Sequence, residues 1–357
     1  MKVALDKSSL VNFKHGGQPD TTPLVLGSAT LEPELKVQLL GIWLERRLSW
    51  KAHAKALRGK LETQILALTR LAASVWGCDL ARARMLFTAV VRPLMTYGAG
   101  VVGPSISKEL AVVQNHALRC VAGAYKASPV TLLESELGIP PLELYLASQH
   151  AAFEGRLRDS GLGDQIQRAA QSTAAELRRQ HALYRPPPEL YSSRWPDGTT
   201  KTLLSKWREV WHTRFRLAST AAEAAGPPDL RPRALYRGLR KEQSSILFQA
   251  RTGCIGLRAF LSRMKVPDYE LTCPCNLGDQ TVEHLLLQCQ DARSGVLRAL
   301  GISSLGEAWR ALSAPRTASR IANALLGSGW LPEYRIAEAM RLRSLVEEQE
   351  RAERGAL

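Results

Sequence analysis

Apolar side chains recur at steps of three and four residues after Ala54, until Gly77 interrupts the pattern. The positions in this series are Leu57, Leu61, Ile65, Leu68, Leu71 and Val75. An α-helix has about 3.6 residues per turn, so this spacing places the whole series on one face. We therefore predict a long helix here, with an apolar face that packs into a core.

The same period predicts further helices in the residues that follow. Asp79 can cap a helix that runs toward Tyr97, and Pro93 should bend this helix. The predicted apolar face of this second helix is Met85, Leu86, Val90 and Leu94, and that of a third helix from Ser107 is Leu110, Val113, Ala117 and Val121. Helices near residues 130–137 and 142–158 complete a compact helical domain.

The first 50 residues have a different pattern, in which short extended runs alternate with turns. Leu10–Phe13 and Leu39–Leu44 are mostly apolar, and turn-forming or charged residues follow each run. We therefore predict a short β-structured segment before the helices.

The helical period weakens after residue 160 and returns near residue 234. Arg185–Pro188 and the Ala-, Gly- and Pro-rich stretch Ala221–Arg233 indicate a basic linker, which should contain one or two helices. The predicted fold class is therefore mainly α, with a short N-terminal β segment. The predicted ranges are 1–50 (β segment), 51–160 (helical domain), 161–233 (linker), 234–292 (helices and a cysteine cluster) and 293–357 (helical tail).

The net charge of the chain indicates a class of binding partner. The 357 residues include 48 Lys and Arg against 33 Asp and Glu, which gives a net charge of +15. All of the excess precedes Cys273, because the residues from there onward hold 10 basic and 10 acidic side chains. A basic protein binds polyanions through counterion release, so RNA or DNA is the expected partner. The alternative is a basic protein with no nucleic-acid role.

Membrane and secretory functions are not expected. No apolar run reaches about 18 residues, and the N-terminus is too polar for a signal peptide. Six cysteines are few for a secreted disulfide scaffold of this length. We therefore expect an intracellular protein, in the nucleus or the cytoplasm, with no membrane partner.

Four residues near the C-terminus have the spacing of a metal site. Cys273 and Cys275 are one residue apart, His284 follows nine residues later, and Cys289 completes the set. Three thiolates and one imidazole favour a structural zinc ion. Because His284 and Cys289 are five residues apart, a helix that presents His284 must end before Cys289. The alternative interpretation is a cluster of buried free thiols.

A second cluster of candidate residues surrounds the start of the first helix. Basic side chains there can bind phosphates, while aromatic rings pack against sugars or bases. The candidate nucleic-acid-binding residues are Trp43, Arg46, Arg47, Trp50, Lys51, Lys55, Arg58 and Lys60. The alternative is an ordinary solvated helix face.

Candidate catalytic residues are not apparent. The sequence contains no Asp-Asp dipeptide, no Gly-x-Ser-x-Gly elbow and no Walker loop, and we expect no Mg²⁺ site. Gly98–Gly103 matches a dinucleotide-binding pattern, but it follows a predicted helix, so we interpret it as a connection between helices.

Several stretches resemble one family in the order in which they occur. Leu40–His53 resembles the primer-grip strand and following turn of non-LTR (LINE-like) retrotransposon reverse transcriptases, in particular those of fungal elements. The segments Val91–Gly98, Gln114–Arg119 and Thr131–Pro141 resemble the thumb of that family. Gln249–Leu261 and Thr281–Cys289 resemble its C-terminal zinc-knuckle segment.

The resemblance implies a thumb that holds a template–primer duplex and a knuckle that engages element RNA or target DNA. In the family, the catalytic carboxylates lie upstream of a segment like Leu5–Phe13, and endonuclease and ribonuclease H domains are common. This sequence shows none of these features, so we expect a truncated or degenerate segment that is not an enzyme. The alternatives are a non-catalytic α-helical interaction protein with a structural zinc site, for example a domesticated one, or a fragment without a partner.

Overall fold

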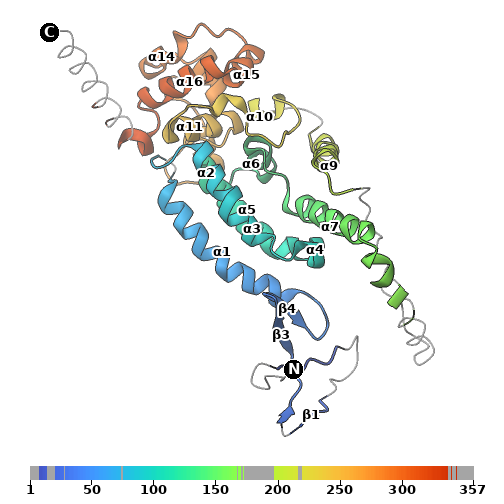
Figure 1. Ribbon diagram of the computed structural model, residues 1–357. Helices are drawn as coiled ribbons and strands as arrows, with labels where there is room; N and C mark the ends of the chain where they lie inside the picture. Colours follow the sequence, from blue (N-terminus) through green and yellow to red (C-terminus); the bar gives the residue numbers. More distant parts are fainter. Residues whose placement is uncertain are drawn as a thin grey trace, which may run out of the picture. The chain divides into compact units, whose positions relative to one another are not determined.

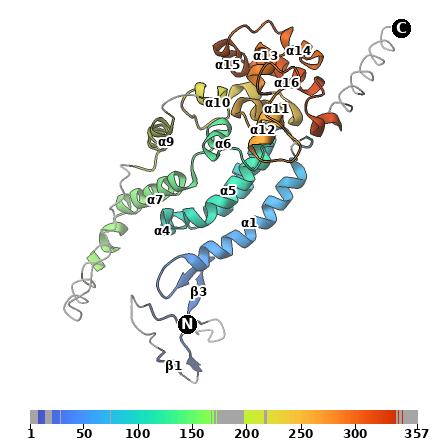
Figure 2. The same cartoon turned by 180° about the vertical axis from the view of Figure 1, so that it is seen from behind.

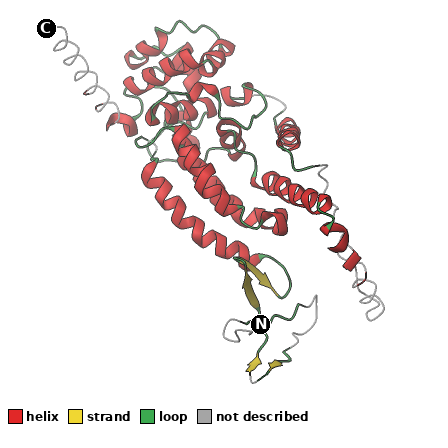
Figure 3. Ribbon diagram, viewed as in Figure 1, coloured by secondary structure: helices red, strands yellow, loops and turns green. Residues whose placement is uncertain are grey.

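The chain is mostly helical in the computed structural model, as the sequence predicts, and its strands lie near the N-terminus (Figures 1 and 3). The structure describes residues 8–13, 21–27, 29–73, 75–166, 168–169, 172, 197–215, 219–336, 339 and 343. The stretch Arg185–Pro188 and most of the predicted C-terminal tail lie outside the described residues.

Two compact units make up the chain, and each gathers segments that are distant in sequence. Unit 1 comprises residues 1–63, 92–114 and 142–205, and unit 2 comprises residues 64–91, 115–141 and 206–357. The five consecutive ranges expected from the sequence stay a prediction.

Unit 1 begins with two antiparallel strand pairs. The strands are β1 (Leu24–Leu26), β2 (Ala29–Leu31), β3 (Lys36–Leu39) and β4 (Ile42–Glu45). The predicted extended run Leu39–Leu44 is in fact two strands, because Leu40 and Gly41 form a tight turn with φ angles of 48° and 81°. Positive φ at both central residues suits the right-handed twist of the flanking strands. Leu10 makes only an isolated bridge to Pro33, so the predicted first strand is not continuous.

Helix α1 (Lys51–Leu71) is tied to the β3–β4 hairpin at its N-terminus. The Glu45 carboxylate accepts hydrogen bonds from the Ala52 amide, at 3.0 Å, and from the Ser49 hydroxyl. Such a carboxylate satisfies an amide of the first helical turn and interacts favourably with the helix dipole. Most of the predicted apolar face is buried, but Leu71 is 53% exposed because the helix ends there.

A buried histidine and a tyrosine join the segments of unit 1. His53 is fully buried, and its Nε2 lies 3.1 Å from the Tyr97 carbonyl oxygen. The Tyr97 hydroxyl in turn donates to the Leu40 carbonyl, at 2.6 Å. The hairpin turn, α1 and the residues after α3 (Arg92–Met95) are therefore held together by two hydrogen bonds.

The second predicted helix exists, but a different face is buried. Asp79 caps α2 (Leu80–Leu86), and a π-helical segment, η2 (Phe87–Val91), separates it from α3. The buried residues are Ala83, Phe87, Val91 and Met95, whereas two of the four predicted ones, Met85 and Val90, are 62% and 47% exposed. Both faces carry apolar residues, so the periodicity does not distinguish them, and the mismatch is already present at Met85, before the π-helical segment begins.

The remaining described helices of unit 1 pack around α7 (Leu142–Asp159). This helix contacts α4 (Ala99–Val102) and η3 (Gly103–Ile106), so the glycine-rich stretch forms short helical turns rather than a nucleotide loop. The predicted buried face of α5 (Ser107–Ala122) is confirmed.

Unit 2 is a cluster of short helices, which Figures 1 and 2 show from opposite sides. Helix α11 packs against α16, α15 and α10, and α13 packs against α14 and α15. Their bounds are α6 (Val130–Leu137), α9 (Thr200–Arg214), α10 (Ala221–Ala224), η4 (Ala234–Tyr236), α11 (Lys241–Thr252), α12 (Arg258–Arg263), α13 (Val282–Leu287), η5 (Ala292–Ser294), α14 (Gly295–Arg298), α15 (Leu305–Ser313), α16 (Pro315–Gly327) and η6 (Pro332–Tyr334).

The stretch Ala221–Arg233, predicted as linker, is packed into unit 2. Ala221 and Ala222 are buried, and a capping box between Thr220 and Glu223 begins α10. Small side chains allow close packing against α15, so a composition that indicates a linker also suits a tight helix contact.

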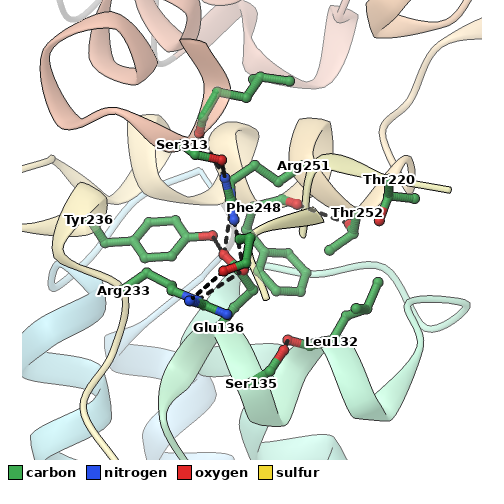
Figure 4. Close-up of polar contacts among 12 residues, drawn as sticks. Leu132, Ser135, Glu136, Thr220, Arg233, Tyr236, Phe248, Arg251, Thr252 and Ser313 are labelled. Atoms are coloured by element: carbon green, nitrogen blue, oxygen red, sulfur yellow. Dashed lines mark hydrogen bonds and ion pairs between the residues drawn. The ribbon is translucent and has the colours of Figure 1, made fainter. Parts of the chain in front are cut away.

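An ion pair with no exposed surface lies at the centre of unit 2. The Arg251 guanidinium donates to both carboxylate oxygens of Glu136, at 2.9 Å each. The Tyr236 hydroxyl donates to the same carboxylate at 2.6 Å, and Figure 4 shows these side chains and Arg233 converging on Glu136. The remaining Arg251 nitrogen, Nη1, donates to the Leu312 carbonyl and the Ser313 hydroxyl, at 2.8 Å each.

This cluster shifts the proton affinities of its members. Burial acts to lower the pKa of Arg251, but the Glu136 carboxylate outweighs that effect and raises it. Burial and the Glu136 charge both raise the pKa of Tyr236 well above its ordinary value. Arg251 therefore stays charged, and the tyrosine stays neutral, throughout the ordinary pH range.

Two more contacts attach α11 to the end of α5 within unit 2. The buried Lys241 ammonium donates to the Cys120 and Val121 carbonyls, at 3.0 and 2.8 Å. Gln249 donates to the Gly123 carbonyl at 2.8 Å. Carbonyls at the C-terminus of a helix lack intrahelical partners, so these donors cap α5.

Length and apolar composition decide whether a helix of the described residues is a candidate for a membrane span. No single helix there combines the length and apolar character of a span, and one bent pair, Leu80–Met95 with Ala99–Ala122, passes on length and composition alone.

Glu136→Gln should destabilise the protein by about 3–5 kcal/mol, because it leaves the buried Arg251 cation without its counter-charge. Chemical denaturation followed by circular dichroism measures this change. The matched control is Glu62→Gln, which removes an exposed partner of Arg58 and should cost less than about 1 kcal/mol. Equal effects of the two substitutions would contradict a central role for the buried pair.

Candidate functional site

A tight turn presents the first two cysteines of the predicted metal set. The Cys273 amide donates to the Gly278 carbonyl, and the Asn276 amide donates to the Cys273 carbonyl, at 2.9 Å each. Asn276 has a φ of 57°, a left-handed conformation that asparagine tolerates better than most residues. The turn therefore places Cys273 and Cys275 on the same side.

A short capped helix presents the other two ligands. The Thr281 hydroxyl accepts a hydrogen bond from the His284 amide at 3.2 Å, and this bond caps α13. The helix ends at Leu287, and the Cys289 amide donates to the His284 carbonyl at 2.9 Å. The structure thus confirms the predicted helix end before Cys289.

The four side chains converge on one point. Their candidate ligand atoms all lie within 4.8 Å of one another. The Sγ atoms of Cys273 and Cys289 are 3.6 Å apart, and the Cys275 Sγ is 3.1 Å from the His284 Nε2. In tetrahedral zinc sites, sulfur atoms lie roughly 3.8 Å apart and a sulfur lies roughly 3.6 Å from a ligand nitrogen. The cluster could therefore hold a metal ion after small side-chain movements.

Burial favours a closed site over a catalytic one. Cys273, His284 and Cys289 are buried, and Cys275 is half-buried. The Nδ1 of His284 is buried without a hydrogen-bond partner in the described residues, so Nε2, which faces Cys275, is the nitrogen available to a metal. Four protein ligands fill a tetrahedral coordination sphere, which leaves no position for a substrate.

The two cysteines of the turn differ in acidity. Burial raises the pKa of the Cys273 thiol well above its ordinary value. Burial acts in the same direction on Cys275, but hydrogen bonds from the Leu277 and Gln290 backbone outweigh it and lower the pKa to about 6. A metal ion must therefore displace a proton from Cys273, whereas Cys275 is largely a thiolate at neutral pH.

Two arginines support the end of the site. Arg298 donates to the Cys289 carbonyl and, at 3.1 Å, to the Asp291 carbonyl. Arg293 pairs with the Asp291 carboxylate at 3.0 Å and stacks 3.6 Å from the Trp330 ring centroid. These contacts fix the backbone that follows the last ligand. These contacts are not predictable from the sequence pattern, because no short-range spacing links Arg298 to Cys289.

The predicted nucleic-acid-binding residues all lie in unit 1, around the hairpin and the start of α1. Trp43 is on β4, and Lys36 on the paired strand lies 5.0 Å from its ring centroid. Arg46, Arg47 and Trp50 lie between β4 and α1. Lys36 was not among the predicted binding residues. It could have been identified from the sequence as a cross-strand neighbour of an aromatic residue.

Not all of the helical candidates share a face. Lys51, Lys55 and Arg58 are exposed and follow one another at steps of four and three residues, so they form a stripe. Lys60 is nine residues after Lys51, which places it on roughly the opposite side of the helix. Arg58 is also paired with the exposed Glu62 at 2.9 Å, which reduces the local excess of charge.

Comparisons with known proteins give one partial match. Over 143 residues, 39% of this chain, the sequence is 25% identical to a probable RNA-directed DNA polymerase from transposon BS of Drosophila melanogaster. The matched stretch spans 16% of that protein's length. No protein-family model and no solved structure match the chain. The chain is thus similar in part to a transposon reverse transcriptase, whereas the fungal type and the C-terminal position stay predictions.

Purified protein should hold about one metal ion per chain, measured by elemental analysis without chelators. Cys273→Ser and Cys289→Ser should each lower the metal content, because each removes a ligand atom. Cys254→Ser is the matched control, since this half-buried thiol lies outside the cluster. An equal metal content in all three variants would exclude the site.

Chelation should unfold the segment around residues 270–290, because metal binding supplies folding free energy to so short a segment. Hydrogen exchange should then increase there, while amides near Leu57–Leu68 of α1 stay protected. Loss of protection in both places would show that the metal stabilises more of the chain than its own segment.

Proposed function

We propose that this chain is a retrotransposon-derived reverse-transcriptase segment that binds nucleic acid and does not polymerise DNA by itself. Its partial similarity to a transposon RNA-directed DNA polymerase carries the proposal. On this proposal the residues correspond to the end of the palm, the thumb and the zinc knuckle of a fungal-type element. The chain then acts in the nucleus or the cytoplasm.

The charge distribution supports a nucleic-acid partner. The net charge is +15, and the stripe Lys51, Lys55 and Arg58 follows directly after Arg46 and Arg47. Trp43 and Trp50 lie beside these cations, so phosphate contacts and ring stacking are available on the same surface of unit 1. A template–primer duplex or element RNA is the proposed ligand.

The metal centre has a structural role in this proposal. Thiolate and imidazole ligands in a closed tetrahedral set favour zinc over magnesium or calcium, which prefer oxygen ligands. Cys273, Cys275, His284 and Cys289 would hold the ion and fix the turn and α13. The ion then stabilises the turn and α13 and takes no part in a reaction.

The absence of polymerase activity is proposed from the sequence. Phosphoryl transfer by polymerases needs carboxylates that hold two metal ions, and no Asp-Asp pair occurs in the 357 residues. Positioning groups alone do not replace these ligands.

A helical interaction protein is the second candidate, and exposed apolar side chains of unit 2 favour it. These are Leu66, Leu71, Trp76, Met85 and Val90, all from residues 64–91. Apolar residues that form one contiguous exposed patch mark protein–protein contact surfaces, so this candidate requires these side chains to adjoin one another. No measurable binding to nucleic acid at roughly 50 mM salt would favour this candidate, because electrostatic binding is strongest at low salt.

Reversing the charges of Arg46, Arg47, Lys55 and Arg58 to Glu should weaken duplex binding about equally across sequences and flatten its salt dependence. Each lost phosphate contact lowers the slope of log K against log salt by about 0.9. Fluorescence anisotropy at several salt concentrations measures both effects. Lys60→Glu, on the other side of α1, should change the slope by much less, and an unchanged slope in the folded fourfold variant would place the ligand elsewhere.

Primer extension on poly(rA)–oligo(dT) should show no template-dependent incorporation with either Mg²⁺ or Mn²⁺. Heat-treated protein provides the background. Incorporation above that background by the purified chain would disprove the inactive assignment but would leave the similarity to transposon polymerases intact.

A further inference from the structure

The turn before α1 contains a sequence feature that nucleic-acid binding does not explain. Arg46 and Arg47 stand three and two residues before Ser49, and Trp50 follows it directly. No other serine or threonine in the 357 residues has arginines at both of these positions. Protein kinases with an acidic substrate cleft select acceptor serines by this charge pattern.

The structure exposes this segment. Arg47, Leu48 and Ser49 are all exposed, and Ser49 belongs to a connection between β4 and α1 rather than to either element. Leu48 and Trp50 have φ angles of 47° and 61°, a left-handed conformation that is strained for residues with side chains. A kinase that straightens this turn therefore releases strain on both sides of the acceptor.

The Ser49 hydroxyl has one partner, the Glu45 carboxylate, which also accepts from the Ala52 amide. The hydroxyl proton therefore points toward the same carboxylate that caps α1. A phosphate on this oxygen removes the donor and sets a dianion against Glu45. The phosphate can replace Glu45 as the acceptor for Ala52, because the N-terminus of a helix favours negative charge.

We propose that Ser49 is a phosphorylation site for an arginine-directed protein kinase, and that its modification weakens nucleic-acid binding. The Ser49 Oγ attacks the γ-phosphorus of ATP, the new O–P bond replaces the bond to the β-phosphate oxygen, the hydroxyl proton passes to the base of the kinase, and ADP leaves. The effect on binding rests on the proposed function, whereas the modification itself does not.

The consequence for binding follows from the position of the charge. Arg46 and Arg47 lie three and two residues before Ser49, and Lys51 lies two residues after it. A phosphoserine adds between −1.5 and −2 charges at about neutral pH. These charges neutralise two of the neighbouring cations and repel the phosphates of a ligand. Binding should fall on the order of 10- to 100-fold at roughly 0.1 M salt, and the salt slope should fall by about two.

The test starts with the full chain, folded and unmodified, treated with Mg-ATP and the catalytic subunit of a cyclic-AMP-dependent protein kinase. Mass spectrometry should find one phosphate at Ser49. Ser49→Ala should abolish incorporation, and Arg46→Ala should reduce it several-fold. Ser319→Ala is the matched control, because Ser319 has one arginine three residues earlier and lies half-buried on α16. Phosphate only in heat-denatured protein, or none at Ser49, overturns the site.

Anisotropy with a labelled duplex then compares the phosphorylated chain, the unmodified chain and Ser49→Ala. Ser49→Ala removes the hydrogen bond to Glu45 without adding charge, so its affinity should stay within about twofold of the unmodified chain. Phosphorylated protein that binds as tightly as unmodified protein overturns the effect on binding. If the unmodified chain does not bind the duplex at all, the proposed function is refuted. The proposed phosphorylation is then still decided by whether phosphate is incorporated at Ser49.

Discussion

The ion pair between Glu136 and Arg251 imposes the main constraint on unit 2. Moving two charges out of water costs several kcal/mol for each ion, and only complete hydrogen bonding offsets that cost. Here both carboxylate oxygens are bonded, and the guanidinium also reaches Leu312 and Ser313 at the end of α15. The residues of the pair are 115 positions apart, so α6, α11 and α15 must meet in one arrangement before either charge is satisfied.

The stretches that resemble reverse transcriptases include the residues that make long-range contacts. Tyr97 bonds to Leu40 and to His53 in unit 1, and Glu136 bonds to Arg251 in unit 2. Gly138 belongs to the same group, because a Cβ there would lie 2.3 Å from the Arg231 backbone. These residues are therefore explained by folding.

Local patterns predicted the helices well, and they failed where distant contacts decide the structure. Asp79 was correctly expected as a cap, since a cap depends only on residues within one turn. The predicted buried face of the α2–α3 segment was wrong, because a second apolar face through Ala83, Phe87 and Val91 packs into the core, and no short-range pattern distinguishes the two faces. The four metal-site residues were found from spacing alone, whereas Arg298 and the Glu136–Arg251 pair depend on contacts that a single sequence does not display.

The Cys/His cluster, once it binds a metal ion, and the buried ion pair would stabilise unit 2 in different ways. Helix α13 has six residues and the turn before it is short, so neither is stable by itself. The apolar residues Val282, Leu285 and Leu286 are buried, and α13 packs against α14 and α15. The core therefore packs against α13, while the segment around residues 270–290 would still depend on a bound ion for much of its folding free energy. The ion pair decides which helices meet, and a bound metal ion would stabilise the turn and the short helix that carry its ligands.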